Sequence, residues 1–326
     1  MLLGLRCFGQ TLIVTSSSSD VMSYITSLKR IHVFLVSHIE LNHSLLTSPK
    51  FNYEEGSPTS LSFDVSTSTM YLRAKWCEIN HSGTIENLLG QLLGISCLNN
   101  CSLPIHASAV STERGAFLFI GKSGSGKTNL AFSLYKRGGY KWISNDYLAV
   151  GLDQKNQLVV LQQDDFLDFR KLSFSDMVSF LPIEITEKIC SRFPISDSPR
   201  VKSSPPFLVC DLNLESMQLP CPVQGLFFPS ISQTSFTFID ILPPSCVSQV
   251  LIQEILSPVR GLTSSILNNH KEVISISLPL EPQLGWANLN SLINKLAFEL
   301  PAYELHAPLS LALDFVSLTI AEILED

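Results

Sequence analysis

Residues 116–128 read Ala116-Phe117-Leu118-Phe119-Ile120-Gly121-Lys122-Ser123-Gly124-Ser125-Gly126-Lys127-Thr128, and they predict a buried strand, a glycine loop and the start of a helix. The run over 116–120 is apolar throughout, as in parallel strands that are covered on both faces. After the loop, Leu130, Ala131 and Leu134 recur at helical spacing. The stretch therefore predicts an α/β fold organised around this loop.

The loop fits the pattern G-x-x-x-x-G-K-[ST], which binds phosphate for a physical reason. Successive backbone N–H groups must turn inward around phosphate oxygens, and side chains at the glycine positions would obstruct that conformation. Lys127 can reach the β- and γ-phosphates, the Thr128 hydroxyl can ligate Mg²⁺, and the helix adds the positive end of its dipole. We predict a nucleotide phosphate site, with an ordinary glycine turn as the alternative. Its residues are Gly121, Lys122, Ser123, Gly124, Ser125, Gly126, Lys127 and Thr128.

The composition limits the classes of protein to which the chain can belong. The length of 326 residues and the hydrophobic content of 45% suggest two domains, or one large domain with an appendage. The net charge is −7 and no cluster of Lys and Arg occurs, which disfavours a nucleic-acid surface. The eight cysteines have irregular spacing without a zinc pattern, so we expect reduced thiols.

The sequence also bears on localisation. No apolar run approaches the ~20 residues of a membrane span, and the amino terminus lacks a basic region before a cleavage site. We expect a soluble, cytoplasmic protein that binds no membrane.

The chain before the loop has a different character. Residues 1–98 look like a small N-terminal α+β domain, with strands expected over 3–15 and 69–75 and a helix over 85–95. Residues 47–67 are rich in turn-forming residues. We find no catalytic constellation in this part. The remaining residues, 99–326, form the second expected domain.

An acid follows the loop at an informative distance. Residues 141–146 read as a strand that ends in Asp146, and the carboxyl end of a strand beside the loop is where an acid meets a metal-bound phosphate. The runs 207–211 and 236–240 also end in an acid. Each of those acids is either a Mg²⁺-facing carboxylate or the polar end of a buried strand; the two are Asp211 and Asp240.

A histidine precedes the loop in a strand of its own. We expect a strand over 104–110 that pairs with 116–120 through a turn at 112–115, and it contains His106. From the residues alone, a satisfied core histidine and a functional histidine are equally good interpretations of His106.

These elements together resemble the catalytic domain of HPr kinase/phosphorylase-like proteins. The resemblance rests on His106 in His-Ala-Ser-Ala-Val, the glycine loop, a helix ending Lys136-Arg137-Gly138, and Ile143-Ser144-Asn145-Asp146, and it covers about 104–150. His106 precedes Gly121 by fifteen positions, the spacing of that family's motif histidine. The resemblance implies a P-loop kinase domain of the HPr kinase/PEP carboxykinase-like type over 99–326. It further implies that Lys127 and Thr128 hold ATP and Mg²⁺, with Asp146 as base and His106 as its neighbour.

The chain also departs from the family pattern. Asn145 stands where the family has the first acid of an Asp-Asp pair, so one negative charge near the phosphates is missing. The turn before it is one residue longer, within 138–140. Asp168-Phe169-Arg170-Lys171 resembles a later motif in position but lacks its glycine, and it makes Asp168 a candidate second metal ligand. Arg260, followed by Gly261, is a faint candidate for the segment associated with phosphorolysis. We therefore do not predict HPr itself as the substrate.

The expected function is that of an ATP-dependent kinase. The γ-phosphate would pass to a serine or another hydroxyl of a protein, a peptide or a small molecule, with Asp146 taking the proton and Lys127 stabilising the transferring phosphoryl group. A nucleotide-binding regulator or ATPase without an acceptor is the main alternative, and an interaction protein with a degenerate loop is a third. The sequence leaves the acceptor open, and a homo-oligomer is compatible with it.

Overall fold

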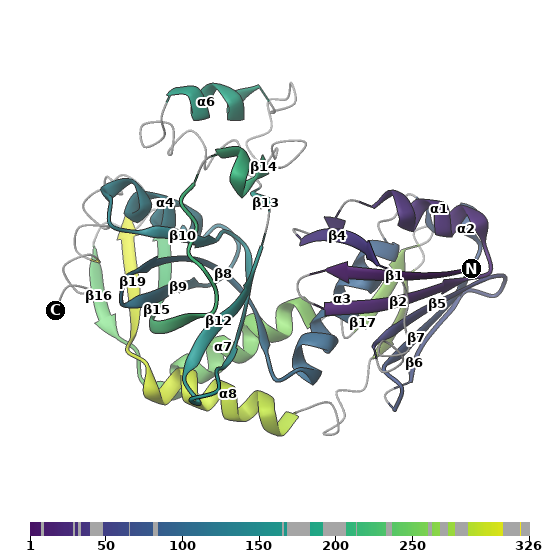
Figure 1. Ribbon diagram of the computed structural model, residues 1–326. Helices are drawn as coiled ribbons and strands as arrows, with labels where there is room; N and C mark the ends of the chain where they lie inside the picture. Colours follow the sequence, from purple (N-terminus) through teal and green to yellow (C-terminus); the bar gives the residue numbers. More distant parts are fainter. Residues whose placement is uncertain are drawn as a thin grey trace. The chain divides into compact units, whose positions relative to one another are not determined.

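The computed structural model (Figure 1) shows a mixed α/β fold. It describes residues 1–7, 10–28, 30–31, 34–39, 48–64, 66–80, 84–164, 166–167, 183–191, 207–212, 214–232, 237–259, 263–267, 273–277, 286–308 and 320. The chain divides into two compact units. The first unit comprises Met1–Pro104 and Ile255–Leu292, and the second comprises Ile105–Glu254 and Ile293–Asp326. The domain boundary expected after residue 98 falls inside a helix, and residues 255–292, assigned above to the second domain, group with the first unit.

The first unit is built on a seven-stranded mixed sheet with the order β3-β4-β1-β2-β5-β7-β6. Its strands are β1 (Leu2–Cys7), β2 (Gln10–Ser16), β3 (Arg30–Ile31), β4 (Phe34–Ile39), β5 (Lys50–Glu55), β6 (Ser60–Asp64) and β7 (Thr69–Ala74). A separate two-stranded sheet is formed by β17 (Thr263–Leu267) and β18 (Val273–Ser277). The helices are α1 (Ser19–Ser27), α2 (Trp76–Ile79) and α3 (Thr84–Asn99).

One stretch of the first unit is more regular than its composition indicates. The turn-rich stretch 47–67 contains two strands, β5 and β6. β5 alternates in burial, with Phe51 and Tyr53 inside and charged residues at its end. It pairs in parallel with β2 and with β7, so partners distant in the sequence form this strand despite its polar composition.

The second unit contains an eight-stranded sheet, drawn in Figure 1 with β10, β8, β9, β15, β19 and β16 across it. Its strands are β8 (Leu103–Thr112), β9 (Gly115–Ile120), β10 (Lys141–Ser144), β11 (Tyr147–Leu152), β12 (Leu158–Gln163), β15 (Cys221–Ser232), β16 (Phe238–Ile241) and β19 (Ala302–Pro308). The pair β8–β9 is the predicted antiparallel hairpin, in which Thr112 faces Gly115. β9, β15 and β19 run parallel to one another. Their carboxyl ends therefore meet at one edge of the sheet.

Helices complete the second unit. They are α4 (Lys127–Arg137), α6 (Ile183–Cys190), the part of α7 (Pro244–Val259) up to Glu254, the last residues of α8 (Trp286–Glu299), and the short 3-10 helix η3 (Val209–Leu212). β13 (Phe166–Leu167) and β14 (Phe207–Leu208) form a small sheet of their own. The predicted amphipathic face of α4 packs Leu130 and Leu134 into a core with Phe119, Phe227 and Trp142. This packing fixes the start of α4 at the end of β9.

The sequence also predicts a strand over 207–211 and a helix over 309–324. The strand predicted over 207–211 is wrong beyond its first two residues, because the chain turns into η3 and Asp211 lies in that helix. The helix predicted over 309–324 lies, apart from Ile320, outside the described residues. Among the helices that the structure describes, none combines the length and apolar character needed to cross a membrane.

Candidate functional site

The glycine loop connects β9 to α4 and has a backbone that side chains would obstruct. Gly124 and Gly126 adopt φ angles of 89° and 99°, which L-residues rarely take. A Cβ atom on Gly126 would also lie 2.5 Å from Cδ1 of Ile231. The neighbouring strand holds the loop in place, since the Ile231 backbone N–H donates to the Ser125 carbonyl at 3.1 Å. The buried Ser125 hydroxyl has no hydrogen-bond partner among the described residues, and a polar group at this place suits a polar ligand.

Lys127 turns back into this loop. Its side chain is only 5% exposed, and its ammonium group donates to the carbonyls of Gly121 and Lys122 at 2.6 and 3.1 Å. A buried cation needs such oxygen atoms around it. Phosphate oxygens carry negative charge and accept stronger hydrogen bonds than neutral carbonyls do. The residues of the loop therefore fit a phosphate group.

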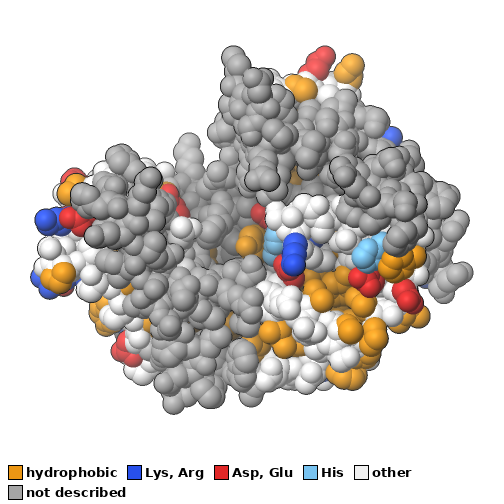
Figure 2. All heavy atoms as spheres, turned by 180° about the vertical axis from the view of Figure 1, so that it is seen from behind, with side chains coloured by type: hydrophobic (Ala, Val, Ile, Leu, Met, Phe, Trp, Pro, Cys, Tyr) orange, Lys and Arg blue, Asp and Glu red, His pale blue; other side chains and the backbone are white. Residues whose placement is uncertain are grey.

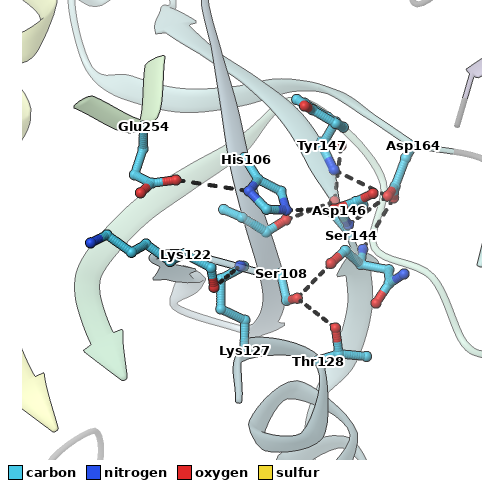
Figure 3. A network of polar contacts seen from close by, with 12 residues as sticks. His106, Ser108, Lys122, Lys127, Thr128, Ser144, Asp146, Tyr147, Asp164 and Glu254 are labelled. Atoms are coloured by element: carbon cyan, nitrogen blue, oxygen red, sulfur yellow. Dashed lines mark hydrogen bonds and ion pairs between the residues drawn. The ribbon is translucent and has the colours of Figure 1, made fainter. Parts of the chain in front are cut away.

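Ser108 connects the helix start with the turn that carries the acid (Figure 3). This buried β8 residue donates from Oγ to the Asn145 carbonyl at 2.6 Å, and Thr128 Oγ1 lies 3.4 Å from Ser108 Oγ. Ser108 has a single hydroxyl proton, so Thr128 is the donor in their contact. The lone pairs of Thr128 then stay available to a cation, as a magnesium ligand requires.

His106 forms the centre of a charged group at the same edge. Its Nε2 lies 2.6 Å from Asp146 Oδ1, and its Nδ1 lies 3.8 Å from Glu254 Oε2, as Figure 3 shows. The three side chains come from β8, from the turn between β10 and β11, and from α7. Burial lowers the pKa of His106, but the hydrogen bonds to Asp146 and Glu254 outweigh it, and the net pKa is raised. The histidine thus holds one oxygen of Asp146 in a fixed direction.

Asp164 fixes the turn that carries Asp146. Its fully buried carboxylate accepts three backbone N–H groups, from Asn145 at 3.2 Å, Asp146 at 2.7 Å and Tyr147 at 3.1 Å. Burial and then the Asp146 carboxylate raise the pKa of Asp164 to about 7, although the three N–H donors act in the opposite direction. Burial, followed by the nearby carboxylates, also raises the pKa of Tyr147. Asp164 therefore determines where the Asp146 side chain starts.

The structure brings together most of the residues singled out in the sequence. His106, the glycine loop with Lys127 and Thr128, and Asp146 lie at one edge of the sheet. Asp168 lies outside the described residues. Asp211 and Asp240 are not part of this group, since one lies in η3 and the other is exposed on the edge strand β16. In the parts that the structure describes, no three His, Cys, Asp or Glu side chains form a metal-binding cluster.

Three residues of the group were not singled out in the sequence. Ser108, Asp164 and Glu254 all contact residues that were. The one usable signal was at Asp164, which follows the apolar run of β12 much as Asp146 follows β10. None of the eight cysteines forms a disulfide bond in the structure.

No model of a known protein family matches the sequence, and no curated protein matches it significantly.

Proposed function

We propose that the chain is an ATP-dependent phosphotransferase of the HPr-kinase-like type, acting on a hydroxyl acceptor, and that its second unit is a P-loop kinase domain of the HPr kinase/PEP carboxykinase-like type. One observation carries the proposal: the Asp146–His106 pair lies at the same edge of the sheet as the glycine loop, and Ser108 links the Asp146 turn to Thr128. A phosphoryl-transfer site needs this combination of a phosphate cradle and a base within one local network.

The loop residues bind and orient the nucleotide in this proposal. Backbone N–H groups of 121–126 surround the phosphates, and the Lys127 ammonium exchanges its two carbonyl partners for phosphate oxygens. The Thr128 hydroxyl would hold Mg²⁺, and that ion would neutralise charge on the phosphates. Lys127 then stabilises the negative charge on the transferring phosphoryl group.

Asp146 acts on the acceptor. Its side chain is 28% exposed, so a hydroxyl group can approach it, while His106 holds Oδ1. The acceptor proton passes to the Asp146 carboxylate as the acceptor oxygen bonds to the γ-phosphorus. The bond between that phosphorus and the bridging oxygen breaks, and ADP leaves. Acceptors of this chemistry are serine side chains of proteins or peptides and hydroxyls of small molecules.

An isosteric substitution tests the base. We expect Asp146→Asn to lower transfer of γ-phosphate to a component of a source-cell lysate by about 10²–10⁴-fold, because an amide cannot take the proton. Affinity for Mg·ATP should change little, since the loop is untouched. Glu299→Gln is the matched control, because Glu299 is an exposed acid of the same unit that pairs with Lys295. Undiminished transfer by Asp146→Asn would contradict the proposed role.

A second function, a nucleotide-binding regulator or ATPase without an acceptor, is favoured by Asn145. Its amide stands in place of a family acid, and within the part of the chain that the structure describes its buried Oδ1 has no hydrogen-bond partner. Less negative charge at this point weakens the case for a second metal ligand beside Thr128. Steady release of ADP and free phosphate by the purified chain, with no labelled lysate component, would select this function over the kinase.

A further inference from the structure

A second cluster of rings and charge lies in the same unit, away from the His106–Asp146 pair. Phe238 of β16 and His306 of β19 stack with ring centroids 4.5 Å apart and an interplanar angle of 13°. His306 Nε2 is 2.7 Å from Glu304 Oε1, which holds the imidazole in this orientation. Phe238 is nevertheless 38% exposed. The pair thus presents an ordered aromatic surface to an incoming molecule.

The register of the strands relates this cluster to the glycine loop. β15 touches the loop through Ile231, whose N–H donates to the Ser125 carbonyl. In the next strand His306 is the partner of Ser230, the residue immediately before Ile231, and Phe238 is in turn the partner of His306. Adjacent strands are about 4.8 Å apart, so the backbone of β19 at His306 lies one strand spacing from the strand that contacts the loop. Ser230 and Ile231 point to opposite faces, so the His306 ring lies on the face away from the Ile231 side chain.

The two clusters lie on opposite sides of the loop along the sheet. β8, which carries His106, pairs with one edge of β9, whereas β15 and then β19 follow on its other edge. Figure 2 shows two histidine side chains, in pale blue, on one face, each beside acidic side chains in red. Ligands of open α/β sheets bind across the carboxyl ends of such parallel strands. A molecule seated on the loop can therefore extend toward both clusters.

The chemistry of the second cluster indicates which end of a nucleotide it fits. Glu304 is 41% exposed at the side chain, and its negative charge disfavours a second phosphate at this place. A flat, uncharged base gains instead from stacking on the face or edge of aromatic rings. We propose that Phe238 and His306 form the platform for the nucleoside base, while the terminal phosphate faces Asp146. This inference rests on the proposed function, because it requires nucleotide phosphates on the loop.

Stacking has a consequence for specificity. Every base has a π-face, so a platform of two rings accepts purines in general and does not select one of them by hydrogen bonds. The site therefore takes ATP and GTP with similar affinity. Inorganic tripolyphosphate, which lacks a base, binds the loop but makes no use of the platform.

The experiment compares these ligands by titration calorimetry on the full chain. We expect Phe238→Ala to weaken Mg·ATP binding by roughly tenfold, the loss typical of one stacked base, and to leave Mg·tripolyphosphate affinity unchanged. Phe238→Tyr should retain the ATP affinity of the wild type. Ile241→Ala is the control, because Ile241 lies on the same strand and is 71% exposed. Lys127→Ala should lower the affinity for both ligands by the same factor.

The outcomes separate the platform from the phosphate site. Wild-type affinity of Phe238→Ala for ATP would overturn the platform and leave the loop site standing. An equal loss of affinity for both ligands in Phe238→Ala would also overturn the platform, because the effect would not depend on the base. If the wild-type chain binds neither ligand, the proposed function fails, and the platform fails with it.

Discussion

The two units differ in the kind of polar side chain that they bury. Among the described residues, the buried polar side chains of the first unit are neutral amides and hydroxyls: Gln10, Ser16, Thr69, Thr84, Ser96 and Ser102. The second unit buries hydroxyls too, but it adds Lys127, Asp164 and Glu254. Burial of an ionisable group costs far more free energy than burial of a hydroxyl, and it needs several partners to offset that cost.

The networks around these groups show what the difference means. In the first unit Gln10 Oε1 accepts from Ser96 Oγ at 2.8 Å and from Asn100 Nδ2 at 2.6 Å, which ties α3 to β2. In the second unit Asp164 binds the turn that aims Asp146, and Glu254 lies beside His106. A neutral network is sufficient to join two elements. Ionisable groups concentrated at one edge of a sheet are the feature on which the proposed function rests.

Removing one buried acceptor from each unit tests this comparison most strongly. We expect Asp164→Ala to lower the free energy of unfolding by about 4 kcal/mol, because three backbone N–H groups lose their acceptor. Gln10→Ala, the counterpart in the first unit, should lower the free energy of unfolding by about 1–2 kcal/mol, since the donors are side chains that can rotate to other acceptors. Urea unfolding measures both. Equal losses would remove the distinction between the units.

The pH dependence sharpens the same comparison. The Asp164 carboxyl ionises near its ordinary pKa of 3.8 in the unfolded chain, but only at about 7 in the folded one. Between these values the unfolded state has released the proton and the folded state has not, so stability falls as pH rises. Relative to Asp164→Asn, the wild type should lose about 2 kcal/mol between pH 5 and pH 7.

His106 adds to this trend. Its raised pKa contributes stability below 6.5, and that contribution is lost as pH rises through the folded value. The Gln10 network contains no ionisable group, so the loss caused by Gln10→Ala should be the same at each pH. Urea unfolding at intermediate pH values measures these differences. A wild type that gains stability over Asp164→Asn with rising pH would contradict the burial argument.

The smallest expected effect concerns backbone conformation. The first unit places L-residues at positive φ, for example Ser68 at 48°, whereas the loop of the second unit uses glycines. Gly124→Ala should lower the free energy of unfolding by about 1 kcal/mol through its φ angle alone, because no atom of the described residues lies within 4 Å of the added Cβ. Gly126→Ala should cost more, since its Cβ would meet Ile231. Ser68→Ala should change stability by less than about 0.5 kcal/mol, and thermal unfolding of the three variants checks the order.

Local signals account for what the sequence predicted well. The apolar run of β9, the glycine loop and the spacing of leucines in α4 all lie within residues 116–137, and the structure confirms this strand–loop–helix order. The hairpin with β8 was equally readable, because a short turn joins two apolar strands. Each of these predictions depends on residues close together in the chain.

Long-range partners account for what was missed. β5 is a strand because it pairs with β2 and β7, and the residues of 50–55 do not by themselves predict these pairings. Asp164 accepts hydrogen bonds from the backbone N–H groups of residues 145–147. Every residue except proline has such a group, so the sequence does not indicate which of them an acid will bind. Glu254 arrives on α7, far beyond the loop in the chain. Its role follows only from the position of that helix next to His106.

Because the chain passes back and forth between the two units, it restricts how the protein can be divided into fragments. The backbone passes from one unit to the other after Pro104, after Glu254 and after Leu292. No single cut yields two whole halves, because each unit draws on two separate stretches of the polypeptide. A fragment that starts at Ile105 carries 255–292 without the sheet they group with, so an engineer who wants the glycine loop alone has to excise that stretch and rejoin α7 to α8.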